Sequence, residues 1–223
     1  GAVLEQRPDD GEALYMAAVA NRYLRRFDDA SQCLGALHRV MPEYGRAWQE
    51  EGHLAIARND PAQAIMAFDR ATRFNPALTA SWREQAKLLQ AAGQLEQAAL
   101  ATAQFERVST LPRELLAVTN HLHEGRLLQA EELCRHFLKS NPRNVEGMRL
   151  LARIGLGLGI LDDAEFLLES AATFEPDNIQ IRLDYIDVLR RRQKFDTALS
   201  EAAALHARDG PRRWRAERLL AHH

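Results

Sequence analysis

Cysteine is scarce in this sequence, which contains only Cys33 and Cys134. The two cysteines lie far apart along the chain and match no metal-ligand spacing. We therefore expect two reduced thiols, as in a cytoplasmic protein.

An excess of one charge and a long hydrophobic run are both absent from the sequence. The chain carries 29 basic and 31 acidic side chains, so its net charge of −2 gives no overall attraction to nucleic acid or to an anionic membrane. No apolar run approaches the ~20 residues that span a bilayer, and the first residues show no signal-peptide pattern. We expect no membrane association and a cytoplasmic location.

β-Branched residues are few, whereas alanine and leucine are abundant, and this composition favours helix. The chain also repeats itself with alanine as the marker. The marker recurs every 34 residues in two series, with one shorter interval of 32 between them: Ala30, Ala64, Ala98, Ala130, Ala164 and Ala198. A period of this length indicates stacked supersecondary units.

Each period contains two apolar stripes of helical spacing, separated by a short break such as "RND" at 58–60 or "AGQ" at 92–94. Prolines such as Pro42 and Pro76 follow the second stripe and stop it. Each period is therefore predicted to be a helix, a tight turn and an antiparallel helix. Neither helix can bury its stripe alone, so neighbouring periods must stack on one another.

The glycines of "ARIGLGLGILDDAE" (152–165) invite a second interpretation, a phosphate-binding loop. Gly159, however, occupies the same place in its period as Gly93 and Gly125, at the end of the first helix, where a left-handed backbone is needed. The residues before it are helical in pattern, whereas the dinucleotide fingerprint follows a strand. Gly155 and Gly157 should weaken their helix by about 1 kcal/mol each relative to alanine, and should allow close approach of a neighbouring backbone or a bound segment.

The 34-residue pattern resembles the tetratricopeptide repeat (TPR), and the clearest copy is "AWQEEGHLAIARNDPAQAIMAFDRATRFNP" at 47–76. This copy matches the family pattern at Trp48, Gly52, Ala64, Phe68, Ala71 and Pro76. It departs at Glu51, where leucine is usual, and at Ala55, where tyrosine is usual. The resemblance implies an all-α fold, a right-handed superhelical solenoid of antiparallel helix pairs.

The repeat register predicts the domain organisation. Residues 1–10 look like the tail of a preceding repeat, and 213–223 like the start of a truncated or capping helix. Six repeats are expected between them, at 11–44, 45–78, 79–110, 111–144, 145–178 and 179–212. Because a helix pair is cut at both ends, we expect a longer parent protein.

A narrower resemblance concerns "HEGRLLQAEELCRHFLKSNPRNVEGMRLLARI" and the segments that follow it. These look like the repeat region of bacterial TPR–sulfotransferase fusions. The resemblance implies an alternative function, a substrate-presenting N-terminal region of a larger transferase whose catalytic domain is not in this chain.

Catalytic constellations with suitable spacing are not found, so the chain alone is predicted to be non-enzymatic, with no cofactor and no metal. His121 and His123 are two residues apart on a helix and point in different directions, so they cannot share a metal. The acidic pair at 162–163 begins a second helix, where carboxylates complement the helix dipole.

The first helices of successive repeats are expected to line a concave groove. Its predicted partner-binding residues are Arg22, Arg46, Gln49, His53, Arg83, Lys87, Gln90, Thr119, Arg149, Arg153, Asp187 and Arg190. Only Glu12 and Asp187 are counted as acids on this face, and Leu115 with Leu122 is expected to interrupt it with an apolar saddle.

Arginine-rich grooves suit carboxylates, because a guanidinium can pair with both oxygens. The hypothesis is therefore a protein–protein interaction scaffold that binds a peptide or partner segment, preferably acidic. A nucleic-acid partner is disfavoured by the net charge and by the few aromatic residues on the groove face.

Overall fold

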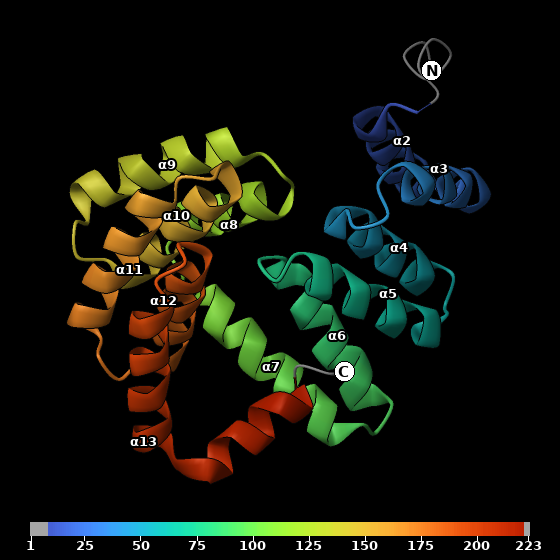
Figure 1. The fold of residues 1–223 in the computed structure, drawn as a ribbon. Helices are drawn as coiled ribbons and strands as arrows, with labels where there is room; N and C mark the ends of the chain where they lie inside the picture. Colours follow the sequence, from blue (N-terminus) through green and yellow to red (C-terminus); the bar gives the residue numbers. More distant parts are fainter. Residues whose placement is uncertain (1–8, 221–223) are drawn as a thin grey trace. The chain divides into compact units, whose positions relative to one another are not determined.

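The computed structural model describes the backbone of residues 9–220 and the side chains of residues 9–207, and every regular element in that part is an α-helix (Figure 1). The helices are α2 (Gly11–Tyr23), α3 (Phe27–Val40), α4 (Gly45–Ala57), α5 (Pro61–Phe74), α6 (Thr79–Ala91), α7 (Leu95–Ser109), α8 (Arg113–His123), α9 (Leu127–Ser140), α10 (Val145–Leu158), α11 (Leu161–Phe174), α12 (Ile179–Arg191) and α13 (Phe195–Leu220). None of the helices in the described range is long and apolar enough to cross a membrane.

The helices pack as antiparallel hairpins. The pairs α2–α3, α4–α5, α6–α7, α10–α11 and α12–α13 are each in extensive contact, and successive hairpins contact each other through α3–α4, α5–α6 and α11–α12. The chain forms two compact units, one from α2 to α8 and one from α9 to α13, and the division follows Gly125. The predicted fold class, an all-α repeat of paired helices, is confirmed.

The turns between paired helices recur at the same distance from the marker alanines. Five residues before each marker alanine, the backbone is left-handed, with φ between 59° and 77°, at Arg25, Asn59, Gly93, Gly125, Gly159 and Gln193. Gly159 therefore ends α10 with a left-handed residue, as predicted, and does not belong to a phosphate loop. Where glycine is replaced by arginine, asparagine or glutamine, the same turn forms with some backbone strain.

The marker alanines lie in the packed interior. Ala30, Ala64, Ala130 and Ala164 have no exposed surface, and Ala98 and Ala198 have less than a tenth. A small side chain at this position lets the second helix of each repeat lie close against its neighbours.

The loop prolines contribute a repeated hydrogen bond in addition to stopping helices. The indole of Trp48 donates to the carbonyl of Pro42 at 2.8 Å, and the indole of Trp82 donates to Pro76 at 2.9 Å. These bonds tie the loop between two repeats to the first helix that follows it. Other helices begin after a polar capping residue. The side chains of Asp60 and Asn144 accept hydrogen bonds from backbone N–H groups in the first turn of the helix that follows.

The two unexplained glycines of α10 are at close contacts. A Cβ atom on Gly155 would lie 3.2 Å from the carbonyl oxygen of Ile160, so the predicted close approach of a neighbouring backbone is confirmed. A Cβ on Gly157 would lie 3.1 Å from a methyl group of Leu127 on α9, which is a side-chain contact.

The structure differs from the sequence expectations in two places. α13 is a single helix from Phe195 to Leu220, so no separate helix begins after Gly210 and Pro211. A proline inside a helix removes one hydrogen bond but has a helical φ, so the chain can continue through it. The predicted tail at 1–10 and the last residues, 221–223, lie almost entirely outside the described residues.

The second difference corrects two groove residues. Leu115 is completely buried and Thr119 is 8% exposed, so neither forms part of an open groove surface. The Thr119 hydroxyl donates to the carbonyl of Leu115 at 2.8 Å within α8. The apolar pattern of α8 is therefore a core stripe, and the predicted apolar saddle is wrong at Leu115.

Candidate functional site

The predicted groove residues of the first unit are held in ion pairs. Arg22 on α2 pairs with Glu50 on α4, through two hydrogen bonds from the guanidinium. Glu50 is only 4% exposed, and the other buried polar side chains among the described residues carry no charge. The Arg22 charge is therefore neutralised inside the unit.

Arg46 on α4, and Arg83 and Lys87 on α6, are also paired with carboxylates. The guanidinium of Arg46 on α4 donates to the carboxylate of Glu124, just beyond the end of α8. Arg83 and Lys87 are exposed and both contact Glu84, at 3.0 and 3.2 Å. These three basic residues are thus balanced by carboxylates that the sequence interpretation did not count.

The neutral groove residues of the first unit are partly engaged as well. Gln49 accepts a hydrogen bond from the hydroxyl of Ser81 at 3.1 Å, which joins α4 to α6. The His53 ring packs edge-on against Phe68, with 5.2 Å between ring centroids. Burial lowers the pKa of His53, although the nearby Glu50 carboxylate acts in the opposite direction. Gln90 is exposed.

In the second unit, Arg149 on α10 lies between two carboxylates. Its guanidinium is 3.1 Å from Glu146 on the same helix and 3.8 Å from Asp184 on α12. The Nε of Arg149 and one oxygen of Asp184 are sealed from solvent without a well-directed hydrogen bond. Near the end of α12, Arg190 and Arg191 both bind Asp187 at 2.8 Å.

Arg153 is the exception among the predicted arginines. It lies one turn beyond Arg149 on α10, is half-buried, and its side chain forms no hydrogen bond or ion pair with the described residues. Burial lowers the pKa of Arg153, and repulsion from Arg149 lowers it further, against the weaker attraction of Asp184.

More acids face the predicted basic groove than Glu12 and Asp187. Glu84 and Glu146 lie beside or one turn from their arginines, so helical spacing could have found them. Glu50, Glu124 and Asp184 come from other helices. Their positions depend on how the repeats pack, and no local signal in the sequence reveals them.

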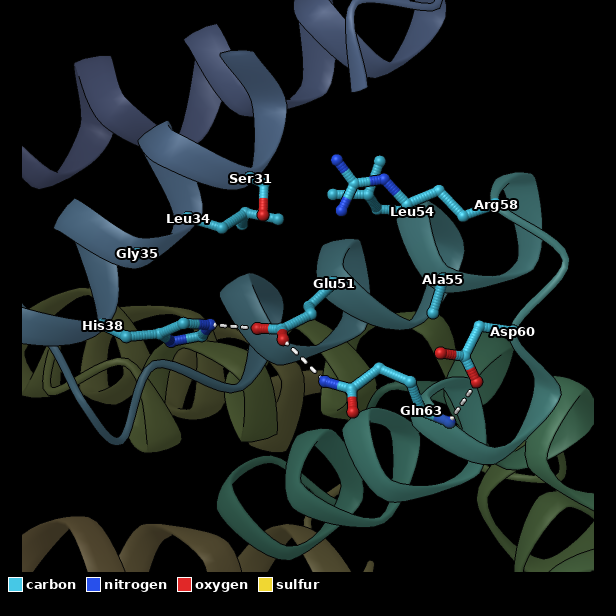
Figure 2. Close-up of a pocket in the computed structure, with 10 residues that line it drawn as sticks. All are labelled: Ser31, Leu34, Gly35, His38, Glu51, Leu54, Ala55, Arg58, Asp60 and Gln63. Atoms are coloured by element: carbon cyan, nitrogen blue, oxygen red, sulfur yellow. Dashed lines mark hydrogen bonds and ion pairs between the residues drawn. The ribbon is translucent and has the colours of Figure 1, made fainter. Parts of the chain in front are cut away.

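A crevice on the other side of α4 was not predicted. It lies between α3, α4 and α5 and has a volume of about 410 Å³ (Figure 2). Its lining residues are Ser31, Leu34, Gly35, His38, Glu51, Leu54, Ala55, Arg58, Asp60 and Gln63. The two departures from the TPR pattern, Glu51 and Ala55, both line this crevice, and they were the signal that could have found it.

A short polar chain crosses the crevice. The carboxylate of Glu51 accepts from Nε2 of His38 at 2.6 Å and from the side-chain amide of Gln63 at 3.0 Å (Figure 2). The hydrogen bond from His38 lowers the pKa of Glu51, and partial burial opposes this effect. Glu51 therefore stays ionised at neutral pH.

No family model matches the chain, and no curated protein matches it. Among solved structures, it is similar to a chain of Naa15/Naa10 bound to HypK-THB, at 17% identity and a TM-score of 0.45, over 93% of this chain and 33% of that one. It is similar to MamA at 14% identity and a TM-score of 0.43, over 80% and 86% of the two chains. It is also similar to the P58(IPK) TPR domain at 16% identity and a TM-score of 0.39, over 96% and 66%. The resemblance to TPR–sulfotransferase fusions stays a prediction.

Proposed function

We propose that this chain is a protein–protein interaction scaffold, and that the surface of α10 and α12 around Arg153 binds a carboxylate of an extended partner segment. The observation that carries this proposal is the half-buried Arg153 side chain, which has no ion-pair partner among the described residues. Every other arginine or lysine in the predicted groove has a carboxylate.

The energetic argument starts from the cost of burial. Removing a guanidinium from water is unfavourable unless a carboxylate or other acceptor replaces the water. Repulsion from Arg149 adds to this burial cost. An incoming carboxylate would offset both the cost of burial and the repulsion from Arg149. A guanidinium can bind it through two parallel hydrogen bonds.

The helical scaffold favours such binding because Arg153 projects from the middle of a packed helix. Its neighbours on α10, Ala152 and Ile154, are completely buried, so the backbone at this position is fixed before a partner arrives. A rigid site loses little conformational entropy when it binds. This supports recognition of an acidic residue or a chain terminus in a partner segment.

The test uses an array of peptides rich in aspartate and glutamate, each beside a matched peptide with asparagine and glutamine. We expect the wild-type chain to retain a subset of the acidic peptides and to lose it at high salt. Arg153→Gln should weaken that retention by about tenfold or more, which corresponds to one charge-assisted contact.

The matched control is Arg190→Gln, because Arg190 is exposed and already bound to Asp187. This variant should keep nearly all of the retention. Equal retention of the acidic and amide peptides, or undiminished retention by Arg153→Gln, would show that the proposed carboxylate site is wrong.

A further inference from the structure

The crevice of the first unit has small residues at two of its lining positions. A Cβ atom added to Gly35 on α3 would meet nothing within 4 Å. On the facing helix, Ala55 is 4% exposed and presents only a methyl group at the place where the TPR pattern has tyrosine. A volume of about 410 Å³ is within the range of small-ligand and side-chain pockets.

The second unit contains the same crevice in a closed form. It lies between α9, α10 and α11, and its volume is only about 10 Å³. Arg135 stands five residues after the marker Ala130, as Gly35 stands five after Ala30, and Gly155 corresponds in the same way to Ala55. The two crevices therefore occupy equivalent places in their repeats and differ in the side chains that line them.

In the second crevice, Arg135 is the lining residue that stands where the first crevice has Gly35. The guanidinium of Arg135 binds Glu131 at 2.9 Å and Asp163 at 3.5 Å. These two carboxylates correspond to Ser31 and Gln63 in the first unit, so the groups that hold the internal arginine are also missing there.

The open crevice has its own carboxylates in different places. Glu51 replaces the apolar Leu151 of the second unit, and Asp60 replaces Ile160. One oxygen of Asp60 caps the backbone N–H of Gln63 at 3.0 Å. The two crevices therefore share a pattern of two acids around a side-chain-sized space, and the first one has no internal arginine.

The remaining charged groups leave an acidic excess around the open crevice. Arg58 lies at its mouth but binds the exposed Asp28 at 2.6 Å. His38, which hydrogen-bonds Glu51, is the other basic group of the lining. Arg70 also acts on Glu51 and lowers its pKa, so Asp28, Glu51 and Asp60 stand against two arginines, with His38 as a titratable ring.

We propose that the crevice between α3, α4 and α5 is a pocket for an arginine side chain of a partner protein. The aliphatic part of that arginine would pack on Leu34 and Leu54, and its guanidinium would face the carboxylates of Glu51 and Asp60 (Figure 2). Guanidinium suits such a site because it pairs with carboxylates in a planar, two-pronged geometry. This pocket is separate from the Arg153 surface and does not depend on it.

The experiment is an NMR titration of the isotope-labelled chain with acetyl-arginine amide. We expect saturable shifts at the backbone amides of Gly35, Glu51 and Ala55, with a Kd of about 1–10 mM, as is reasonable for a single side chain. Acetyl-citrulline amide has the same shape without the charge and should bind at least about tenfold more weakly.

Gly35→Arg should abolish the shifts, because the new arginine side chain would occupy the crevice in place of the partner's arginine. The matched control is Ala103→Arg, which adds the same charge at the corresponding exposed position of α7 and should leave the titration unchanged. Glu51→Gln keeps the pocket open but removes a charge, and should weaken binding about tenfold, which tests the proposal even if Gly35→Arg folds poorly.

Four results would overturn the proposal. They are no saturable shift at about 20 mM ligand, equal binding of the citrulline compound, undiminished binding by Glu51→Gln or by a folded Gly35→Arg, and free L-arginine binding ten times more tightly than the blocked form. The last result would assign the pocket to a small molecule.

Discussion

Arg22 on α2 and Glu50 on α4 join the first helices of two successive repeats through a largely buried ion pair. The two residues are 28 positions apart in the sequence. Because the carboxylate is sealed from water, its charge depends on Arg22 for compensation.

Glu50→Gln is expected to lower the free energy of unfolding by about 1–3 kcal/mol, since it leaves the Arg22 guanidinium without its ionic partner. Urea unfolding of the wild type and the variant measures this difference. The control is Glu12→Gln at an exposed position of α2, which should change little. The double variant with Arg22→Gln should cost less than the sum of the two single changes.

At the left-handed turn residue of each repeat, removing a glycine and introducing one should change the stability in opposite directions. Gly93→Ala should destabilise the chain by about 1 kcal/mol, because an added Cβ meets no neighbour there and only the backbone is strained. Gln193→Gly should stabilise it by about 0.5–1 kcal/mol, because φ is +61° at that position. Thermal unfolding compares the two, and a stabilising Gly93→Ala would contradict the strain argument.

Cys134 is expected to resist alkylation in the folded chain. It is completely buried, and burial raises the pKa of its thiol to about 12. Since the thiolate is the reactive form, iodoacetamide at pH 8 should modify the half-buried Cys33 first and Cys134 only after unfolding. Peptide mass mapping of the modified sites in native buffer and in urea distinguishes the two cysteines.

Acid should weaken the first unit partly through Glu51. Hydrogen bonding from His38 lowers the pKa of Glu51 in the folded state, so the group contributes stability that is present above its ordinary pKa. That contribution is lost as the pH falls below about 4.3 and passes through the lowered pKa. Between pH 6 and pH 3, Glu51→Gln should therefore lose less stability than the wild type in urea unfolding. Glu43→Gln, at an exposed carboxylate, serves as the control.

The fold was largely predictable because its determinants are local and repeated. The marker alanines, the break residues and the loop prolines recur at fixed spacing, and each one sets a helix start, a turn or a packing distance. The continuous α13 was missed because a glycine followed by a proline usually ends a helix, and nothing in the local sequence shows that this helix continues.

The candidate sites were only partly predictable. The sequence predicts a groove position for Arg153 but gives no reason to separate it from Arg149 or Arg22. Helical phase predicts a groove position for Thr119, but phase alone does not say which side of α8 is covered. Glu51 and Ala55 were noticed as departures from a pattern, without a pocket to explain them.

The sequence by itself determined the repeat length, the helix pairs and the residue at which each turn becomes left-handed, since these follow from short-range backbone preferences and periodic burial. Tertiary structure decided which charges are neutralised and which crevice is open. Partners such as Arg46 and Glu124 are 78 residues apart, so only packing brings them together. Likewise, Gly35 and Arg135 occupy equivalent positions, but the empty space beside one and the two carboxylates around the other exist only in the folded chain.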